Sequence, residues 1–217
     1  MKKFEFDIVE HAIDNFFPKE RVKTKLQLLV ILLEATRYML VYPEMKDIDK
    51  EGKVTLVIDK MSRLFFEKSD KFYSIVFPFN ANRIGNKLSF SFQNIDVDSQ
   101  LISNVISTIR CDSFENRCSL DFADAMFEFE NEQEDFWVFL RELILFEDGY
   151  IRYDKDIEGS LQAKVDGNEH RHPVNHYDLY YTNKASFKIG LENEIAMNDF
   201  IDLLDVKTDC KYLKNRG

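Results

Sequence analysis

A long apolar stretch near the N-terminus, KLQLLVILLEATRYML, constrains the fold more than any other segment. Leu26, Leu29 and Leu33 recur in it at helical spacing, which would give a helix a continuous apolar face. Pro18 lies shortly before it, and proline is common in the first turn of a helix. We therefore predict a core helix from Pro18 onward, within a helical N-terminal part over residues 1–45.

Strands are predicted where residues alternate, or where aromatic and β-branched residues gather. Residues 72–79 and 88–92 are expected to form a hairpin, because turn residues separate them. Further strands are expected at 118–122, 150–154, 176–181 and 186–191. Residues 54–58 fit a strand or a helix equally well.

Helices are expected after Asp96 or Asp98, over residues 132–146 and over residues 197–204, with a polar loop over residues 155–169. With only 7 glycines and 4 prolines, the chain has no stretch typical of a flexible linker. The sequence therefore predicts a single α+β domain over residues 1–217, in which N-terminal core helices accompany a mainly antiparallel sheet with interspersed helices. Residues 148–191 are expected to supply the antiparallel strands that carry a candidate site.

Charge and cysteine content bear on partners and compartment. The formal net charge is −10, so the chain as a whole repels nucleic acid, and binding would need a local basic patch. Three scattered cysteines form no disulfide framework, which fits a reducing compartment. Acidic residues interrupt the N-terminus where a signal peptide needs an apolar core, and the longest apolar run is far below the roughly 20 residues that span a bilayer. We therefore expect a cytoplasmic protein with no membrane contact.

Histidines cluster in one place, because three of the four fall within seven residues, in HRHPVNHYD. Proline at 173 pushes the preceding residue toward extended geometry, so His170 and His172 would project to one side. In the strand that follows, His176 and Asp178 share a face. Cationic side chains are expected nearby, at Arg152, Arg171, Lys184 and Lys188.

Three uses of this segment stay open from the sequence. In the first, two histidines exchange protons with the 2′-hydroxyl and the leaving oxygen of RNA, while a cation stabilises the phosphorane. The candidate catalytic residues are Arg152, His172, His176 and Lys188. In the second, a zinc ion or another first-row metal is bound. The candidate ligands are His170, His172, His176 and Asp178. In the third, the histidines are structural and bond to backbone groups at a sheet edge.

Four short motifs in the C-terminal third carry a resemblance to a known family. They are GYIRYD at 149–154, HPVNH at 172–176, FKIGL at 187–191 and NDFI at 198–201. With them the chain resembles an uncharacterised bacterial family of short proteins, some of which are encoded beside a helicase in phage-defence loci. The resemblance implies a setting in antiviral defence. The positions it marks are Arg152, Asp154, His172, Pro173 and His176.

Two functions are compatible with these observations, and whether the protein is an enzyme stays open. One is a ribonuclease-like effector of anti-phage defence that acts on RNA or DNA through the surface around Arg152, His172 and His176. The other is a non-enzymatic interaction module that docks on a partner protein such as a helicase. Its anchors would be three tyrosines, a residue type common in interface hot spots: Tyr177, Tyr180 and Tyr181.

Overall fold

The structure is a computed structural model that describes residues 2–42, 49–85, 87–111, 135–179 and 187–213. The chain divides into two compact units. The sheet unit comprises residues 1–8, 50–76 and 149–217, and the helical unit comprises residues 9–49 and 77–148. Helices and mainly antiparallel strands alternate along the chain, which confirms the predicted α+β class.

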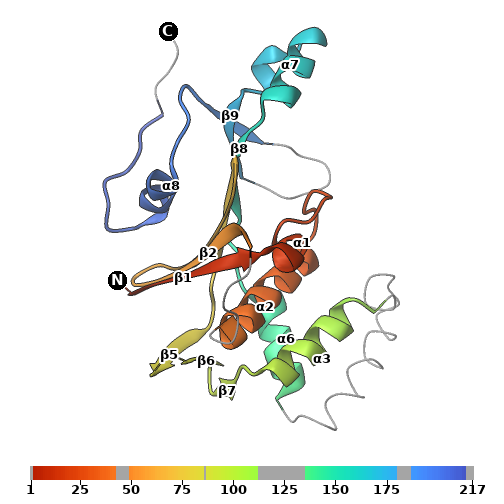
Figure 1. The fold of residues 1–217 in the computed structure, drawn as a ribbon, viewed down its shortest axis with the longest axis vertical. Helices are drawn as coiled ribbons and strands as arrows, with labels where there is room; N and C mark the ends of the chain where they lie inside the picture. Colours follow the sequence, from red (N-terminus) through yellow and green to blue (C-terminus); the bar gives the residue numbers. More distant parts are fainter. Residues whose placement is uncertain (1, 43–48, 86, 112–134, 180–186, 214–217) are drawn as a thin grey trace. The chain divides into compact units, whose positions relative to one another are not determined.

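The sheet unit is built on seven strands in the order β1-β2-β3-β4-β8-β9-β10. Figure 1 labels β1, β2, β8 and β9 of this sheet. Their bounds are β1 (Lys2–Val9), β2 (Lys50–Ile58), β3 (Ser62–Lys68), β4 (Lys71–Val76), β8 (Ile151–Lys155), β9 (Asn175–Asp178) and β10 (Lys188–Leu191). Every pairing from β2 to β10 is antiparallel. The same unit contains α7 (Ile157–Val165), the 3₁₀ helix η3 (Glu169–Arg171) and α8 (Met197–Leu204).

One face of this sheet packs against α8. Phe200 of α8 is fully buried there, with its ring 6.0 Å from both Phe65 and Tyr177. Tyr153 and Phe72 stack beside it with centroids 5.1 Å apart. Aromatic rings of this size dominate the energetics of a core. This face of the sheet is therefore hydrophobic, and at β8 and β9 the polar residues lie on the opposite face. At β3 and β4 the opposite face is apolar as well, since Phe66 and Tyr73 stack there.

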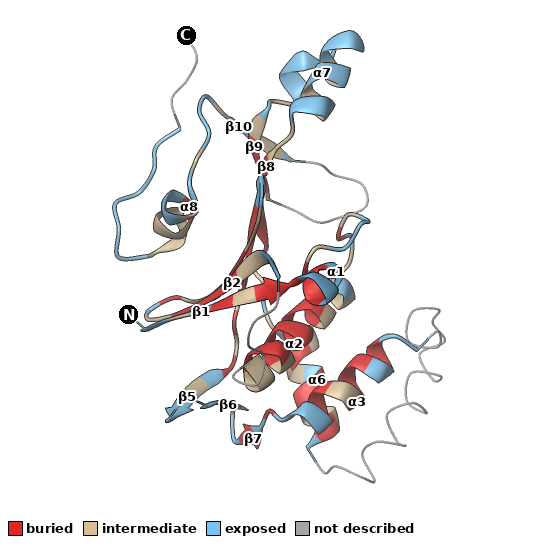
Figure 2. Cartoon of the chain, in the orientation of Figure 1, coloured by how far each residue is buried: buried red, intermediate tan, exposed pale blue. Residues whose placement is uncertain are grey.

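The helical unit contains η1 (Glu10–Ala12), α1 (Ile13–Phe16), α2 (Lys25–Val41), α3 (Ser99–Ile109) and α6 (Phe136–Leu145). It also holds a three-stranded sheet formed by β5 (Asn80–Ile84), β6 (Lys87–Phe92) and β7 (Ile95–Asp96). Residues along α2 are largely buried, as Figure 2 shows, so the predicted core helix is confirmed. The helix predicted after Asp96 or Asp98 is confirmed too, as α3, and Asp98 is the residue that caps it, since its Oδ1 accepts a hydrogen bond from Leu101 N at 2.8 Å.

Two predictions about the N-terminal part need correction. Residues 2–9 form the strand β1, because Phe4, Phe6 and Ile8 alternate with acidic residues at the two-residue period of a strand. The core helix begins at Lys25 rather than near Pro18, because Thr24 and Gln27 form a capping box. The ambiguous residues 54–58 belong to the strand β2.

The predicted hairpin is wrong in its first strand. Residues 71–76 form β4, which pairs with β3 and β8, and it is β5 that pairs with β6. Pro78 explains the difference, because it lacks the backbone N–H that a central strand needs, and β4 ends before it. The predicted strand at 118–122 lies outside the described residues.

The predicted loop over residues 155–169 is also wrong, because it contains α7. Asp156 caps this helix, with its Oδ1 accepting from Gly159 N at 2.8 Å. No residue of α7 is buried, so the helix shows no face packed into a core (Figure 2). The missed signal was the recurrence of Ile157, Leu161 and Val165 at every fourth residue. The final strands and helix are confirmed in their described parts, as β8, β9, β10 and α8.

Candidate functional site

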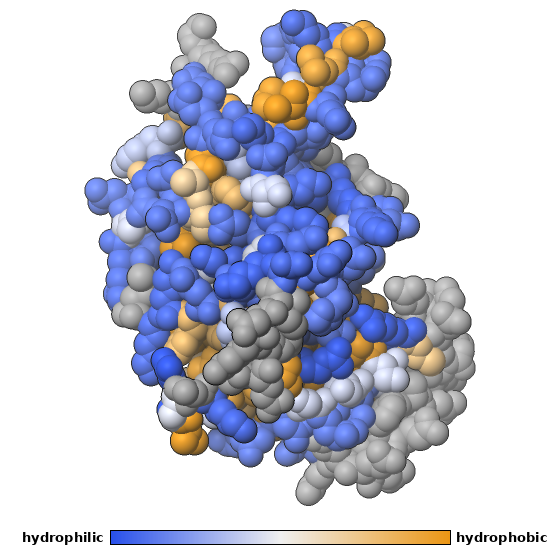
Figure 3. All heavy atoms as spheres, viewed as in Figure 1, coloured by the Kyte–Doolittle hydropathy of each residue, from blue (hydrophilic) through white to orange (hydrophobic). Residues whose placement is uncertain are grey.

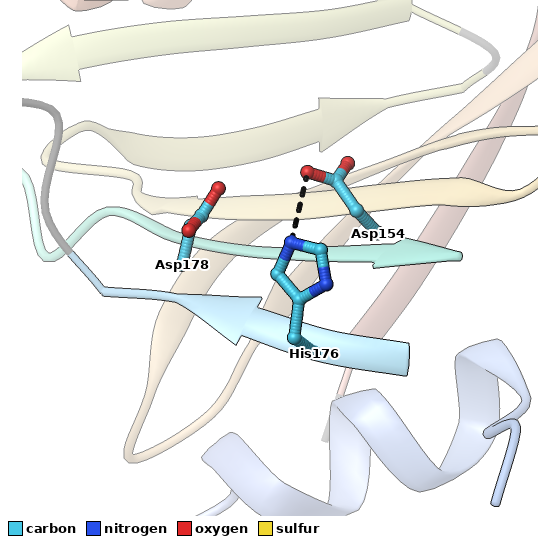
Figure 4. A group of neighbouring side chains, drawn as sticks. All are labelled: Asp154, His176 and Asp178. Carbon is cyan, nitrogen blue, oxygen red and sulfur yellow. Dashed lines mark ion pairs between the residues drawn. The ribbon is translucent and has the colours of Figure 1, made fainter. Parts of the chain in front are cut away.

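Five ionisable side chains meet on one face of β8, β9 and β10. Alternation along a strand places Arg152 and Asp154 of β8 on the same face, and His176 and Asp178 of β9 likewise. The antiparallel register pairs Arg152 with Asp178, Asp154 with His176, and Lys188 of β10 with Asp178. Figure 4 shows Asp154, His176 and Asp178 pointing toward one another from neighbouring strands. We call these five residues the charged network.

Ion pairs connect the charged network through Asp178. Arg152 Nη2 lies 2.5 Å from Asp178 Oδ2 and 2.6 Å from Asp154 Oδ2. Lys188 Nζ lies 3.1 Å from Asp178 Oδ1. The side chain of Asp178 is only 2% exposed, and that of Lys188 only 14%. Two cations and two carboxylates therefore balance one another below the surface.

Both ring nitrogens of His176 are engaged. His176 Nδ1 lies 2.8 Å from the carbonyl oxygen of Pro173, so it carries the proton and donates. His176 Nε2 lies 2.5 Å from Lys188 Nζ, and because an ammonium group has only protons to offer, Nε2 accepts. In this arrangement His176 holds Lys188 in place, which differs from the proton-exchanging role predicted for it.

Burial and charge keep this imidazole neutral. Burial lowers the pKa of His176 below its ordinary value, and the positive charge of Lys188 lowers it further. Burial opposes ionisation of Asp178 as well, but the charges of Arg152 and Lys188 outweigh it and lower the pKa of that carboxyl. The network is thus set for an ionised carboxylate and a neutral imidazole at neutral pH.

The lowered pKa of His176 predicts a pH-dependent stability. Between the folded pKa and the ordinary value of about 6.5, the unfolded chain binds a proton that the folded chain does not. Stability is therefore present above about pH 6.5 and is lost as the pH falls below it, by at most about 1.4 kcal/mol per pH unit. Urea unfolding at several pH values from 5 to 7.5 measures this.

His176→Gln is the matched control, because the amide oxygen of glutamine can accept from Lys188 but does not titrate. The variant should lose less stability than the wild type between pH 7.5 and pH 5. Parallel stability curves for the two proteins would show that His176 does not titrate as its surroundings require.

A groove of about 490 Å³ opens beside the charged network. Its lining comes from α7, from η3 and the residues around it, and from β10, and includes Gly159, Asn168, Arg171, His172 and Lys188. His172 is 27% exposed in its side chain, and its ring centroid lies 5.0 Å from that of His176. Lys188 thus links the buried network to the groove, and His172 is the histidine that a ligand can reach.

Asp156 holds His172 from the start of α7. His172 Nε2 lies 2.8 Å from Asp156 Oδ2, while the other carboxylate oxygen caps α7. Burial opposes ionisation of Asp156, but the hydrogen bonds from Gly159 and His172 outweigh it and lower the pKa of this carboxyl. An ionised carboxylate paired with an imidazole is an arrangement that many acid–base sites use.

The structure brings together most of the residues predicted from the sequence. Arg152, His176 and Lys188 share the charged network, and His172 lies beside it. His170 does not join them, because residues 169–171 form a 3₁₀ turn instead of an extended segment, and its side chain is 91% exposed beside Glu169. Lys184 lies outside the described residues. Sequence reasoning gave no role to Asp156, although its place before an acidic first turn is typical of a helix cap.

The metal hypothesis takes a different form in the structure. Donor atoms of Asp154, His176 and Asp178 lie within 4.8 Å of one another, which is close enough to share an ion. Arg152 and Lys188 already occupy His176 Nε2, both oxygens of Asp178 and one oxygen of Asp154. A metal would have to displace these cations and bear their repulsion. The geometry therefore favours an ion-pair network over a metal centre.

Three polar atoms of the network, Arg152 Nε, Asp154 Oδ1 and Asp178 Oδ1, are buried and form no hydrogen bond with a described residue. Only Asp178 Oδ1 has a charged neighbour that compensates for this, since Lys188 Nζ lies 3.1 Å from it. Leaving such atoms unpaired destabilises a fold, so each instance in a native structure calls for an explanation such as a catalytic role.

Comparisons with known protein families, with curated proteins and with solved structures found no match for this chain. Among the described residues, no helix is long and apolar enough to cross a membrane. A function is therefore inferred from the geometry of the groove and of the charged network.

Proposed function

We propose that the protein is a ribonuclease-like effector, acting in the cytoplasm as part of bacterial anti-phage defence, and that RNA binds in the groove beside β10. The observation that carries the proposal is that His172 and Lys188 line the same groove, each held by a carboxylate behind it. A proton-transferring group and a fixed cation are the two elements that metal-free cleavage of RNA requires. The defence setting rests on the resemblance of the C-terminal motifs.

The role of each residue in RNA cleavage follows from how exposed its side chain is and from what the side chain contacts. His172 takes the proton of the 2′-hydroxyl, and the resulting oxygen attacks the adjacent phosphorus. The bond from phosphorus to the 5′-oxygen breaks, that oxygen takes a proton from water, and a 2′,3′-cyclic phosphate remains. Lys188, with Arg171 at the groove wall, stabilises the charge on the phosphorane. Arg152 and His176 touch no ligand in this account, since they fix Asp178 and Lys188.

Local charge is consistent with an anionic ligand despite the net charge of −10. Arg171 and Lys188 contribute two cations to the lining of the groove, and Asp166 contributes one carboxylate. A local excess of cations over carboxylates is what an acidic chain needs in order to bind nucleic acid.

A second candidate function, docking on a partner protein such as a helicase, is favoured by one observation on α7. Ile157, Leu161 and Val165 are 53%, 60% and 81% exposed, and four-residue spacing places them on one face of the helix. Figure 3 shows hydrophobic side chains along this helix. Exposed apolar stripes commonly mark protein interfaces. The tyrosine anchors predicted from the sequence do not support docking, because Tyr177 is buried against Phe200, and residues 180–186 lie outside the described part.

One experiment separates the two candidates. The wild type, His172→Gln and Leu161→Asp are expressed in bacteria with and without the neighbouring genes, and phage protection and RNA integrity are measured. Both substitutions are at partly or fully exposed positions, so both variants should fold. The effector proposal expects His172→Gln to abolish RNA breakdown and protection, and expects Leu161→Asp to retain RNA breakdown. The opposite pattern, with loss only in Leu161→Asp, would contradict it and favour the docking module.

A further inference from the structure

Hydrogen bonds hold Asp156 through both its backbone and its carboxylate. Its backbone N–H donates to the carbonyl oxygen of Val174 at 2.8 Å, and Oδ1 accepts from Gly159 N at 2.8 Å. With the backbone and one oxygen fixed, Oδ2 faces His172 Nε2 at 2.8 Å. The carboxylate that caps α7 is therefore the same group that holds the histidine of the groove.

Gly159 leaves the space that this arrangement needs. A Cβ atom at position 159 would overlap Asp156 Oδ2 and would lie 2.9 Å from His172 Nε2. Any larger residue would separate the carboxylate from the imidazole or displace both. The start of α7 is thus built to bring Asp156 and His172 into contact.

The contact decides which nitrogen of His172 carries the proton. An ionised carboxylate only accepts hydrogen bonds, so His172 Nε2 must donate. In the neutral imidazole the lone pair then lies on Nδ1, which makes no hydrogen bond with any described residue. Nδ1 is consequently the ring nitrogen of His172 that stays able to accept a proton, and His172 is one of the residues that line the groove.

We propose that Asp156 is the positioning residue of the site: it fixes His172 in the Nε2–H tautomer and so makes Nδ1 the base that takes the proton of the 2′-hydroxyl. The catalytic part of this inference rests on the proposed ribonuclease function. The tautomer itself follows from the contacts of Asp156 and His172 alone.

Asp156→Asn tests the inference because it changes the tautomer while it keeps the helix cap. The amide oxygen of asparagine can still accept from Gly159 N, and asparagine is a favoured N-cap residue. Its NH₂ group then faces His172 Nε2 and donates, which moves the imidazole proton to Nδ1. Asp156→Ser is the second variant, because serine also caps α7 but is too short to hold His172.

The measurement is ¹⁵N NMR of the imidazole nitrogens in histidine-labelled full-length protein, with His172 signals assigned by their loss in His172→Gln. RNA cleavage is measured on the same samples. The wild type should show the Nε2–H tautomer, and Asp156→Asn should show the Nδ1–H tautomer with cleavage reduced by about 10²-fold or more. Asp156→Ser should lose the tautomer preference and most of the cleavage.

Two results would overturn the positioning role: the Nδ1–H tautomer in the wild type, or unchanged cleavage in an Asp156→Asn protein whose tautomer has switched. A third result has a different meaning. If the wild type shows the Nε2–H tautomer but cleaves no RNA, then the contact between Asp156 and His172 stands, and the proposed function fails together with the catalytic part of the inference.

Discussion

Replacing Asp178 with alanine is expected to lower the free energy of unfolding by about 3–5 kcal/mol, because it leaves Lys188 without its carboxylate partner and leaves Arg152 with Asp154 alone. Asp178 contacts both Arg152 and Lys188, and its own side chain is 2% exposed. Removing one partner of a buried ion pair costs far more than the pair itself contributes, since the remaining charge keeps its desolvation penalty. Urea unfolding at pH 7.5 measures the effect.

Glu194→Gln is the matched control for Asp178→Ala. Glu194 also pairs with a lysine, since Lys155 Nζ lies 2.8 Å from its Oε2, but its side chain is 57% exposed. Exposed ion pairs contribute about 0–1 kcal/mol, so this variant should lose no more than that. If Asp178→Ala were as mild as the control, water would already solvate Arg152 and Lys188, and the charged network would not exist as described.

The sequence predicted those parts of the fold in which the local pattern of apolar and capping residues agrees with how the element packs in the structure. The helices after Thr24 and Asp98 have apolar residues at helical spacing and a capping residue at the start, so they could be predicted without knowledge of their tertiary contacts. The partner of β6 could not be predicted in the same way. Strand pairing is a long-range choice, and it depended on Pro78 ending β4 and on β8, far along the chain, pairing with that strand.

The site residues that lie on strands could be predicted, because alternation along a strand decides which face each side chain occupies. Once His176 and Asp178 are placed on one face of β9, Tyr177 must face the other way, into the core against Phe200. The same rule places Arg152 and Asp154 together on β8. The alternation rule fails before Pro173, because residues 169–171 form a 3₁₀ turn, and His170 does not project to the same side as His172.

Asp156 could not be assigned from the sequence for a different reason. A residue that caps a helix can be recognised by its position, but its second contact, with His172, lies 16 residues away and depends on the path of the intervening helix. No residue of α7 is buried, so no core position in the hydrophobic pattern marks how this helix lies.

His172→Gln is expected to reduce the rate of RNA cleavage by about 10²–10⁴-fold, the usual contribution of a general acid or base. Its fold should be intact, because the side chain of His172 is partly exposed at the groove and does not belong to the core.

The chemistry predicts a further property of the substrate. Since the 2′-oxygen is the nucleophile, RNA in which every 2′-hydroxyl is methylated should resist cleavage.

The central claim, that this groove cleaves RNA through its own 2′-hydroxyl without a metal, is tested most directly with purified full-length protein. The wild type and His172→Gln are incubated in excess EDTA with an RNA and with its 2′-O-methyl counterpart, and product ends are identified by mass spectrometry. The account predicts 2′,3′-cyclic phosphate ends from the RNA with the wild type alone, and no cleavage of the methylated strand. Equal cleavage of both strands, or no cleavage of RNA by the wild type, would contradict it.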